Sequence, residues 1–99
     1  MVQLFQLIGK RAKEVVRVED YFSVYFEDDS TLNVYNALGD VAALGIAGKS
    51  VSNVYEKECV ITIVFGGNVC LQIGLRDEDY TGPEALGFKD GKTGRAVYY

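Results

Sequence analysis

The chain has 99 residues, of which 48% are hydrophobic and 24% charged, a balance typical of one small soluble globular domain. Its net charge of −4 argues against a nucleic-acid partner, because phosphate contacts need clustered Lys and Arg. No stretch approaches the roughly 20 apolar residues of a membrane span, and residues 1–9 lack the features of a signal peptide, so we expect a cytoplasmic protein.

An internal repeat organises the chain. Residues 7–35 align without a gap on residues 46–74 at a constant shift of 39 positions, as from Gly9 to Gly48. Identical pairs include Lys10 with Lys49, Val15 with Val54, Glu19 with Glu58, Phe26 with Phe65 and Leu32 with Leu71. A period of this kind indicates one supersecondary unit built twice.

The first copy begins with a predicted strand at residues 11–18 and continues as a hairpin. Its apolar side chains alternate with period two and share one face: Phe22, Val24, Phe26, Leu32 and Val34. Only a loop with an odd number of residues keeps both strands' apolar sets on that face. We therefore predict a three-residue loop at 27–29 that pairs Val24 with Leu32 and ends on a left-handed Asp29.

The joint between the copies, residues 36–45, predicts a short helix. Asp40 is a good capping residue for a helix over Val41–Leu44, and Gly45 is a good terminator.

The second copy repeats the same elements, with a strand at 50–57 and a loop at 66–68 that pairs Ile63 with Leu71 and ends on Asn68. Residues 76–99 then form a turn-rich tail. Phe88 and residues 95–99 predict a last edge strand, with a turn at Asp90-Gly91.

The fold class that these elements indicate is all-β, in a single domain that spans residues 1–99. Each copy is a three-stranded antiparallel meander with one apolar face, and such a sheet alone leaves that face in water. Two copies can bury each other's apolar faces, as a small sandwich or as a closed barrel with an approximate internal two-fold axis.

Three stretches resemble a group of small uncharacterised bacterial proteins: Gly48-Lys49-x-Val51, then Phe65-x-Gly67-Asn68-x-x-Leu71-x-Ile73, then Asp79-Tyr80-x-Gly82-Pro83-Glu84-Ala85. In that group the hairpin turn usually reads Asp-Gly, whereas this chain has Asp28-Asp29 and Gly67-Asn68. The resemblance implies a duplicated β fold. It implies no assigned activity and supplies no catalytic residues.

Few residues suggest catalysis, a cofactor or a metal. The stretch 43–50 is similar to a phosphate-binding loop, but it lacks the first glycine and leads into a strand, so we interpret it as a turn. The chain has no His to activate a nucleophile or to bind zinc. By parity Cys59 is expected to be buried and Cys70 to lie on the opposite face, too distant for a disulfide. We therefore predict no catalytic, cofactor or metal site.

Carboxylates are concentrated in two turn-like stretches, residues 27–29 and 77–79. They could bind Ca²⁺ or Mg²⁺, or act as paired catalytic acids, but acidic residues are also expected in solvated turns. The best candidate for a functional loop is the rigid stretch with Tyr80, Gly82, Pro83 and Glu84. The structural alternative is that Pro83 stiffens a corner and Tyr80 covers the end of a sheet.

The outer face of the first meander is aromatic and carries little charge. The predicted register places Tyr21 opposite Tyr35, Ser23 opposite Asn33, and Tyr25 opposite Thr31. A sheet face in water is expected to carry charged residues. We therefore expect cover from the helix in 36–45, from the tail after Tyr80, or from another molecule, and we select Tyr21, Tyr25, Asn33 and Tyr35 as candidate interface residues.

The functional hypothesis that follows is a non-catalytic protein-interaction module that forms a homodimer. The alternative is a small-molecule-binding domain with a pocket between the sheets or at the loop from Tyr80 to Glu84. An enzyme is the least favoured of the three classes.

Overall fold

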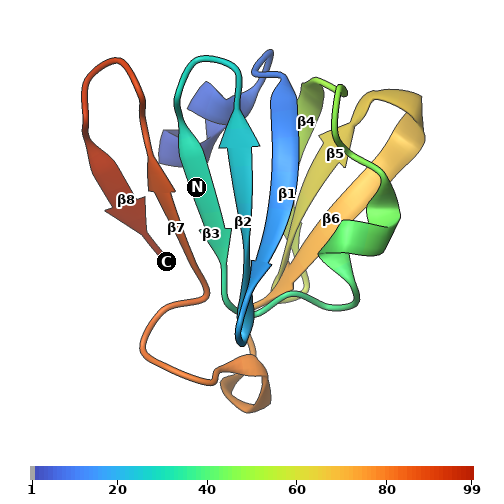
Figure 1. Ribbon diagram of the computed structural model, residues 1–99. Helices are drawn as coiled ribbons and strands as arrows, with labels where there is room; N and C mark the ends of the chain where they lie inside the picture. The colour runs from blue at the N-terminus through green and yellow to red at the C-terminus, as the bar shows by residue number, and fades with distance from the viewer. Residues whose placement is uncertain (1) are drawn as a thin grey trace.

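Two antiparallel β-sheets pack face to face in the computed structural model of this chain, which describes residues 2–99 (Figure 1). The five-stranded sheet has the order β1-β2-β3-β7-β8, with bounds Ala12–Val18, Tyr21–Phe26, Thr31–Val34, Leu86–Lys89 and Ala96–Tyr98. The three-stranded sheet consists of β4 (Val51–Lys57), β5 (Val60–Phe65) and β6 (Val69–Gly74). The all-β prediction is confirmed as a sandwich, and the sheets do not close into a barrel.

Both hairpins have the predicted register. Val24 pairs with Leu32, and Ile63 pairs with Leu71. Each loop ends on the left-handed residue that was expected, Asp29 with φ 70° and Asn68 with φ 62°. The apolar faces therefore point inward, and the side chains of Phe22 and Ile61 belong to the buried core.

The two copies also repeat the bonds that join them. The Gly9 N–H donates to the Val51 carbonyl, and the Gly48 N–H donates to the Ala12 carbonyl, both at 2.8 Å. Each of these bonds maps onto the other when the two copies are exchanged. An antiparallel bridge between Arg11 and the equivalent Ser50 lies at the centre of this exchange. The sequence repeat thus corresponds to an approximate two-fold relation between the sheets.

The tail departs from this symmetry. A single last edge strand was predicted, but residues 86–98 form a complete hairpin, β7 and β8, that pairs with β3. The N–H of Tyr35 donates to the Ala85 carbonyl at 2.9 Å, just before β7 begins. Leu86 and Phe88 then point inward and are buried. The tail therefore extends the first copy's sheet by two strands.

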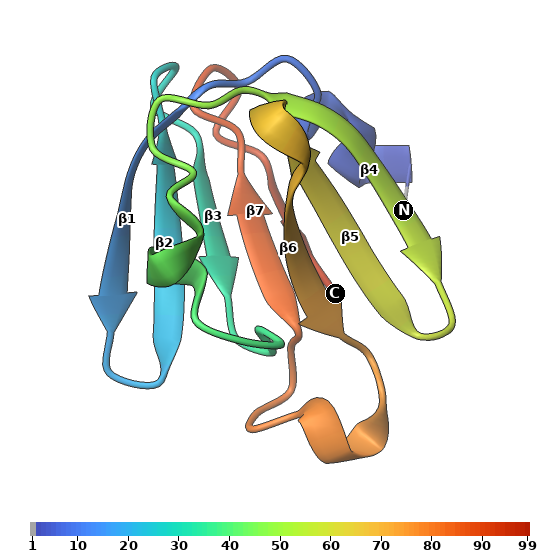
Figure 2. The ribbon, with the colours of Figure 1, turned by 90° about the vertical axis from the view of Figure 1, so that its right-hand side faces the viewer.

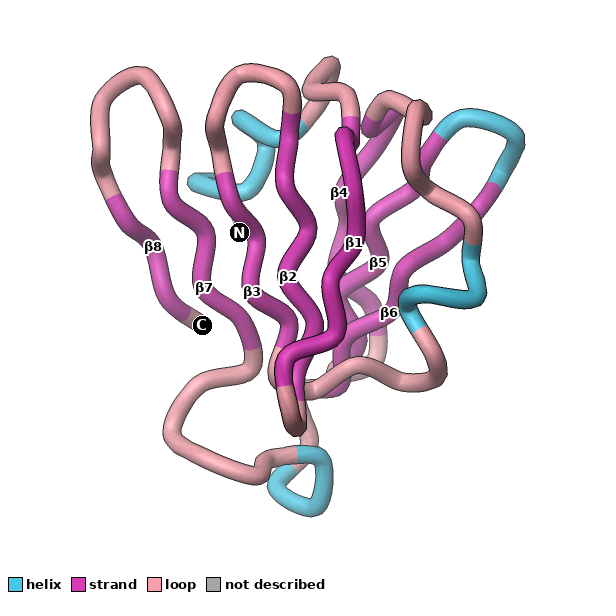
Figure 3. The backbone as a smooth tube through the Cα atoms, in the orientation of Figure 1, coloured by secondary structure: helices cyan, strands magenta, loops and turns pink. Residues whose placement is uncertain are grey.

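The helical segments are short 3₁₀ turns outside the sheets (Figure 3). The predicted joint helix is present as η2 (Val41–Leu44), with the Asp40 carboxylate accepting the Ala42 N–H and with Gly45 left-handed. The others are η1 (Val2–Leu7), η3 (Gly66–Asn68) and η4 (Asp77–Asp79). None of the helices in residues 2–99 has the length and apolar character needed to cross a membrane.

One burial prediction is wrong. Cys59 was expected inside the core, but it is exposed, with φ 62°. It lies in the turn between β4 and β5, so the inward and outward alternation of the strand does not extend to it. Cys70 is exposed and free, on the outer face of the three-stranded sheet.

Candidate interaction surface

The outer face of the five-stranded sheet carries a continuous aromatic surface with few charges, which we call the tyrosine face. Register defines its central row, in which Ser23 pairs with Val16 on one side and with Asn33 on the other. The row continues through Gly87 to Tyr98. With the two rows beside it, the face comprises Glu14, Val16, Val18, Tyr21, Ser23, Tyr25, Thr31, Asn33, Tyr35, Gly87, Lys89, Ala96 and Tyr98.

The four interface residues predicted from sequence all lie on this face. Tyr21 and Tyr35 contact each other, with ring centroids 5.1 Å apart and planes inclined by 50°. Tyr25 is 36% exposed. Asn33 accepts a hydrogen bond from the Ser23 hydroxyl at 2.7 Å, and Ser23 itself is buried. The polar pair at the centre of the face is therefore satisfied within the chain.

Burial raises the pKa of the Tyr35 hydroxyl, a hydrogen bond with Asn33 acts to lower it, and the negative field of Glu84 adds to the increase. Tyr35 therefore stays neutral well above physiological pH. Glu84, a residue of the predicted functional loop, is partly buried.

Tyr98 and Val16 belong to the face but were not identified from the sequence. Tyr98 is 61% exposed, and its ring lies against the backbone of Gly87, where an added Cβ would come within 2.9 Å of the ring. Val16 is 36% exposed. Val16 is placed on the face by the pairing of β1 with β2, and Tyr98 by the pairing of β7 with β3 and β8, which joins residues far apart in the chain.

No described element covers the tyrosine face, which looks toward the viewer in Figure 1. Figure 2 shows the sandwich from its edge, where η2 lies in the opening between the two sheets and contacts β1 and β6. The tail continues the sheet sideways. The expectation that the joint helix or the tail covers this face is therefore wrong, because both elements are used to close or to extend edges.

The loop from Tyr80 to Glu84 joins β6 to β7 across the two sheets (Figure 1). Tyr80 is partly buried and packs against the core, whereas Gly82 and Pro83 are exposed. Tyr80 thus has a packing role, and a functional role of this loop stays a prediction.

The acidic turns have structural partners. Partial burial acts to raise the pKa of the Asp28 carboxyl, but hydrogen bonds from Lys10 and Ser30 outweigh it and hold the pKa at about 2. The Asp79 carboxylate accepts the Arg76 N–H at 3.1 Å and so caps η4. Within residues 2–99, no group of three or more His, Cys, Asp or Glu residues is arranged to hold a metal ion.

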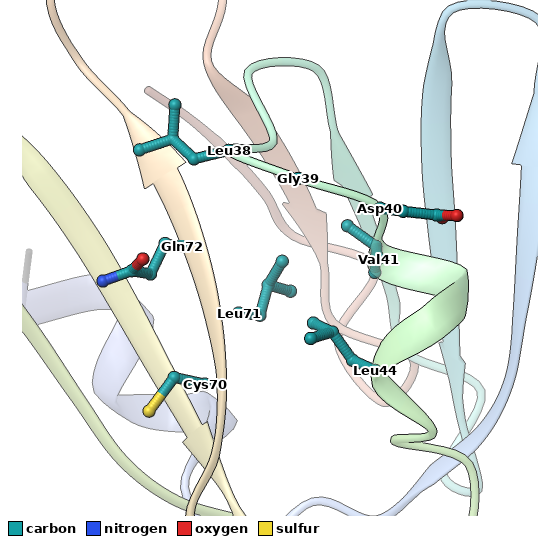
Figure 4. A pocket seen from close by; sticks show the side chains of 8 residues that line it. All are labelled: Leu38, Gly39, Asp40, Val41, Leu44, Cys70, Leu71 and Gln72. Atoms are coloured by element: carbon teal, nitrogen blue, oxygen red, sulfur yellow. The ribbon is translucent and has the colours of Figure 1, made fainter.

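The hollow between β6 and η2 is small. Its volume is about 40 Å³, whereas pockets for drug-sized ligands span about 300–1,000 Å³. Figure 4 shows Leu71, Val41 and Leu44 pointing toward one another there, while Cys70 and Gln72 point to the other side of β6. Side chains therefore fill this part of the space between the sheets.

A larger and more open hollow, of about 370 Å³, lies on the outer face of the three-stranded sheet. Its lining is mainly polar and includes Tyr55, Lys57, Thr62, Gln72 and Arg76. The sequence suggested a ligand pocket elsewhere, between the sheets or at the loop from Tyr80 to Glu84.

Comparison with protein-family models, with curated proteins and with solved structures finds no match to this chain. Its function is therefore inferred from the geometry described above.

Proposed function

We propose that this chain is a non-catalytic protein-interaction module, and that its partner is a further copy of itself bound at the tyrosine face. The observation that carries the proposal is a five-stranded sheet whose outer face is uncovered, aromatic and almost free of charge. Tyrosine is enriched at protein interfaces, because its ring contributes a large apolar area at small entropic cost.

The polar groups of the face are compatible with burial in an interface. Ser23 and Asn33 already bond to each other, so their removal from water leaves few unpaired groups. Tyr21 and Tyr35 support each other's orientation, so less side-chain freedom is lost on binding. Both features favour association through this face over simple solvation.

The chain offers little for catalysis. It contains no His to activate a hydroxyl or thiol nucleophile. The carboxylates of Asp28 and Asp79 already serve Lys10 and the cap of η4. A binding role therefore fits the residues better than an enzymatic one.

The test is the mass of the protein in solution, measured by light scattering and sedimentation from micromolar to millimolar concentration. The wild-type chain is expected to associate as concentration rises. Tyr25→Arg replaces an aromatic ring of the face by a charged side chain and is expected to weaken association at least tenfold, because the apolar contact of the ring is lost and the added charge must be desolvated.

Tyr55→Arg is the matched control, because Tyr55 is similarly exposed (43%) but lies on the outer face of the other sheet. It is expected to leave association unchanged. Thermal unfolding of both variants confirms that each one is folded. A wild-type chain that remains monomeric at millimolar concentration, or equal weakening by both variants, would overturn the proposal.

A second candidate function rests on the hollow of about 370 Å³ beside Lys57 and Arg76. Its lining carries two cations against one carboxylate, Glu58, together with two hydroxyl groups, and this balance favours a small acidic ligand. A thermal-shift screen with small carboxylates and phosphates tests it, because a ligand that binds only the folded chain raises the Tm. An unchanged Tm across the panel, or a shift that persists in Lys57→Ala/Arg76→Ala, would exclude this site.

A further inference from the structure

We propose that the two copies meet face to face about a two-fold axis that runs along the strands, between β2 and β3, so that Glu14 of each copy faces Lys89 of the partner subunit. This inference rests on the proposed function, because it gives the orientation of the copies at the tyrosine face. It follows from where the face carries its few charges.

Glu14 and Lys89 are the charged residues in the rows of the face. Both belong to the row in which Glu14 pairs with Tyr25, Tyr25 with Thr31, and Thr31 with Lys89. They are therefore three strand spacings apart, about 14 Å, which is too far for an ion pair within one chain. Both are exposed, and the described residues place no salt-bridge partner beside either of them.

A half-turn about an axis midway between β2 and β3 exchanges β1 with β7 and β2 with β3. It brings Glu14 over the partner's Lys89, and the same contact recurs once more by symmetry. Packed sheets lie about 10 Å apart, a gap that the two long side chains span together.

The apolar residues match under the same half-turn. Tyr21 meets the partner's Tyr35, which forms a cluster of four rings at the end of the face. Ser23 meets the partner's Asn33, so the polar pairs also lie together at the centre. Val16 meets the partner's Gly87, where the ring of Tyr98 provides an apolar surface.

A two-fold axis across the strands is less favourable. It places each strand over its own copy, so Glu14 lies over the partner's Val18 and Lys89 lies over the partner's Ala85. Both charges are then removed from water without a partner, which is a costly arrangement.

The charge of the flanking strands favours the same orientation. The hairpin in residues 86–99 carries three cations against one acid, whereas residues 12–26 carry two cations against three acids. The half-turn along the strands brings the positive hairpin of one copy toward the negative strands of the other. Charge complementarity of this kind selects an orientation more than it sets affinity.

The test uses Glu14→Lys and Lys89→Glu, alone and mixed. In a homodimer of either variant two like-charge contacts replace two attractive ones, so each variant is expected to dimerise at least tenfold more weakly. In an equimolar mixture every such contact is again between opposite charges. We expect mixed dimers with a Kd within about threefold of the wild type, counted by native mass spectrometry with one chain isotopically labelled.

Glu14→Gln and Lys89→Gln are the controls, because they remove charge without reversing it. In their mixture only one of the two contacts is again Glu14 against Lys89, and no homodimer has a like-charge contact, so the preference for mixed dimers is expected to be weaker than that of the charge-reversed pair. The preference of the charge-reversed pair is expected to fall in 1 M salt, which screens exposed charges. A statistical mixture of dimers would overturn this orientation. If Tyr25→Arg still dissociates the protein, the tyrosine face remains the interface and only the orientation is wrong.

Discussion

The two copies of the repeat have the same strand order and register but support their hairpin turns differently. In the first copy the Lys10 ammonium pairs with the Asp28 carboxylate, and Arg11 pairs with Glu27 at 3.4 Å. In the second copy the corresponding residues are Lys49 with Gly67, and Ser50 with Gly66. Both ion pairs are therefore absent from the second turn, and the strand registers are nevertheless the same in both copies.

The difference has a structural cause in the C-terminal hairpin. The turn between β7 and β8 packs on the first copy's turn, where the Gly91 N–H donates to the Ser30 hydroxyl at 3.0 Å. Ser30 is fully buried, whereas its counterpart Val69 is only partly buried. The comparison teaches that apolar alternation and loop length set the shared fold, while charges stabilise the one turn that a further element contacts.

The largest expected effect comes from Gly91→Ala. A Cβ at this position would lie less than 3.0 Å from backbone atoms of Asp28, Asp29 and Ser30. Because backbone cannot move aside easily, we expect a loss of about 3 kcal/mol in the free energy of unfolding, measured with urea. Gly66→Ala, in the second turn, meets no atom within 4 Å and is expected to change stability by less than about 0.5 kcal/mol. Equal losses would contradict the role given to the β7–β8 turn.

Acid is expected to weaken the first turn selectively. Asp28 has a folded-state pKa of about 2 against an ordinary value of 3.8, so its contribution is complete above pH 4 and is lost as the pH falls toward 2. The shift corresponds to about 2 kcal/mol of folding stability. Urea unfolding between pH 2 and pH 5 measures it as the difference between wild type and Asp28→Asn. A difference that does not change with pH would show that Asp28 titrates normally.

Removal of the two equivalent lysines is expected to have unequal effects. Lys10→Ala leaves the partly buried Asp28 carboxylate without its cation and is expected to cost about 1.5 kcal/mol at pH 7. Lys49→Ala removes a cation that faces a glycine turn and is expected to cost less than about 0.5 kcal/mol. Chemical unfolding of both variants under one set of conditions provides the comparison. A larger loss of stability for Lys49→Ala than for Lys10→Ala would contradict the conclusion that the lysine ion pair stabilises only the first turn.

The smallest effect concerns rebuilding the missing ion pair with Gly67→Asp. A Cβ at this position would lie 3.9 Å from Lys49 Nζ, so a carboxylate there can reach the ammonium. Gly67 has φ 77°, a conformation that Asp tolerates at a cost of about 1 kcal/mol. We expect a net loss of about 0.5 kcal/mol, and a larger loss when Lys49 is Ala. A double-mutant cycle measures the coupling, and a coupling of zero would exclude the new ion pair.

Much of the fold was predictable from local pattern. The alternation of Phe22, Val24 and Phe26 identifies an inward face, and parity alone excludes a two-residue loop between the strands. Asp40 and Gly45 identify the ends of η2 because capping and left-handed termination depend only on neighbouring residues. Tyr21, Tyr25 and Tyr35 could be assigned to the outer face because they alternate with inward-facing residues along their strands.

What the tertiary structure decided depends on contacts between distant segments. The pairing of β7 with β3 brings Gly87 and Tyr98 onto the tyrosine face. It also extends the first copy's sheet from three strands to five. Cys59 was misplaced because strand alternation ends at the turn that contains it. The sequence by itself therefore determined which side chains alternate inward. The packing of the tail and of η2 decided the width of the first sheet and which of its edges are closed, because both depend on nonlocal hydrogen bonds and on burial of Leu86 and Phe88.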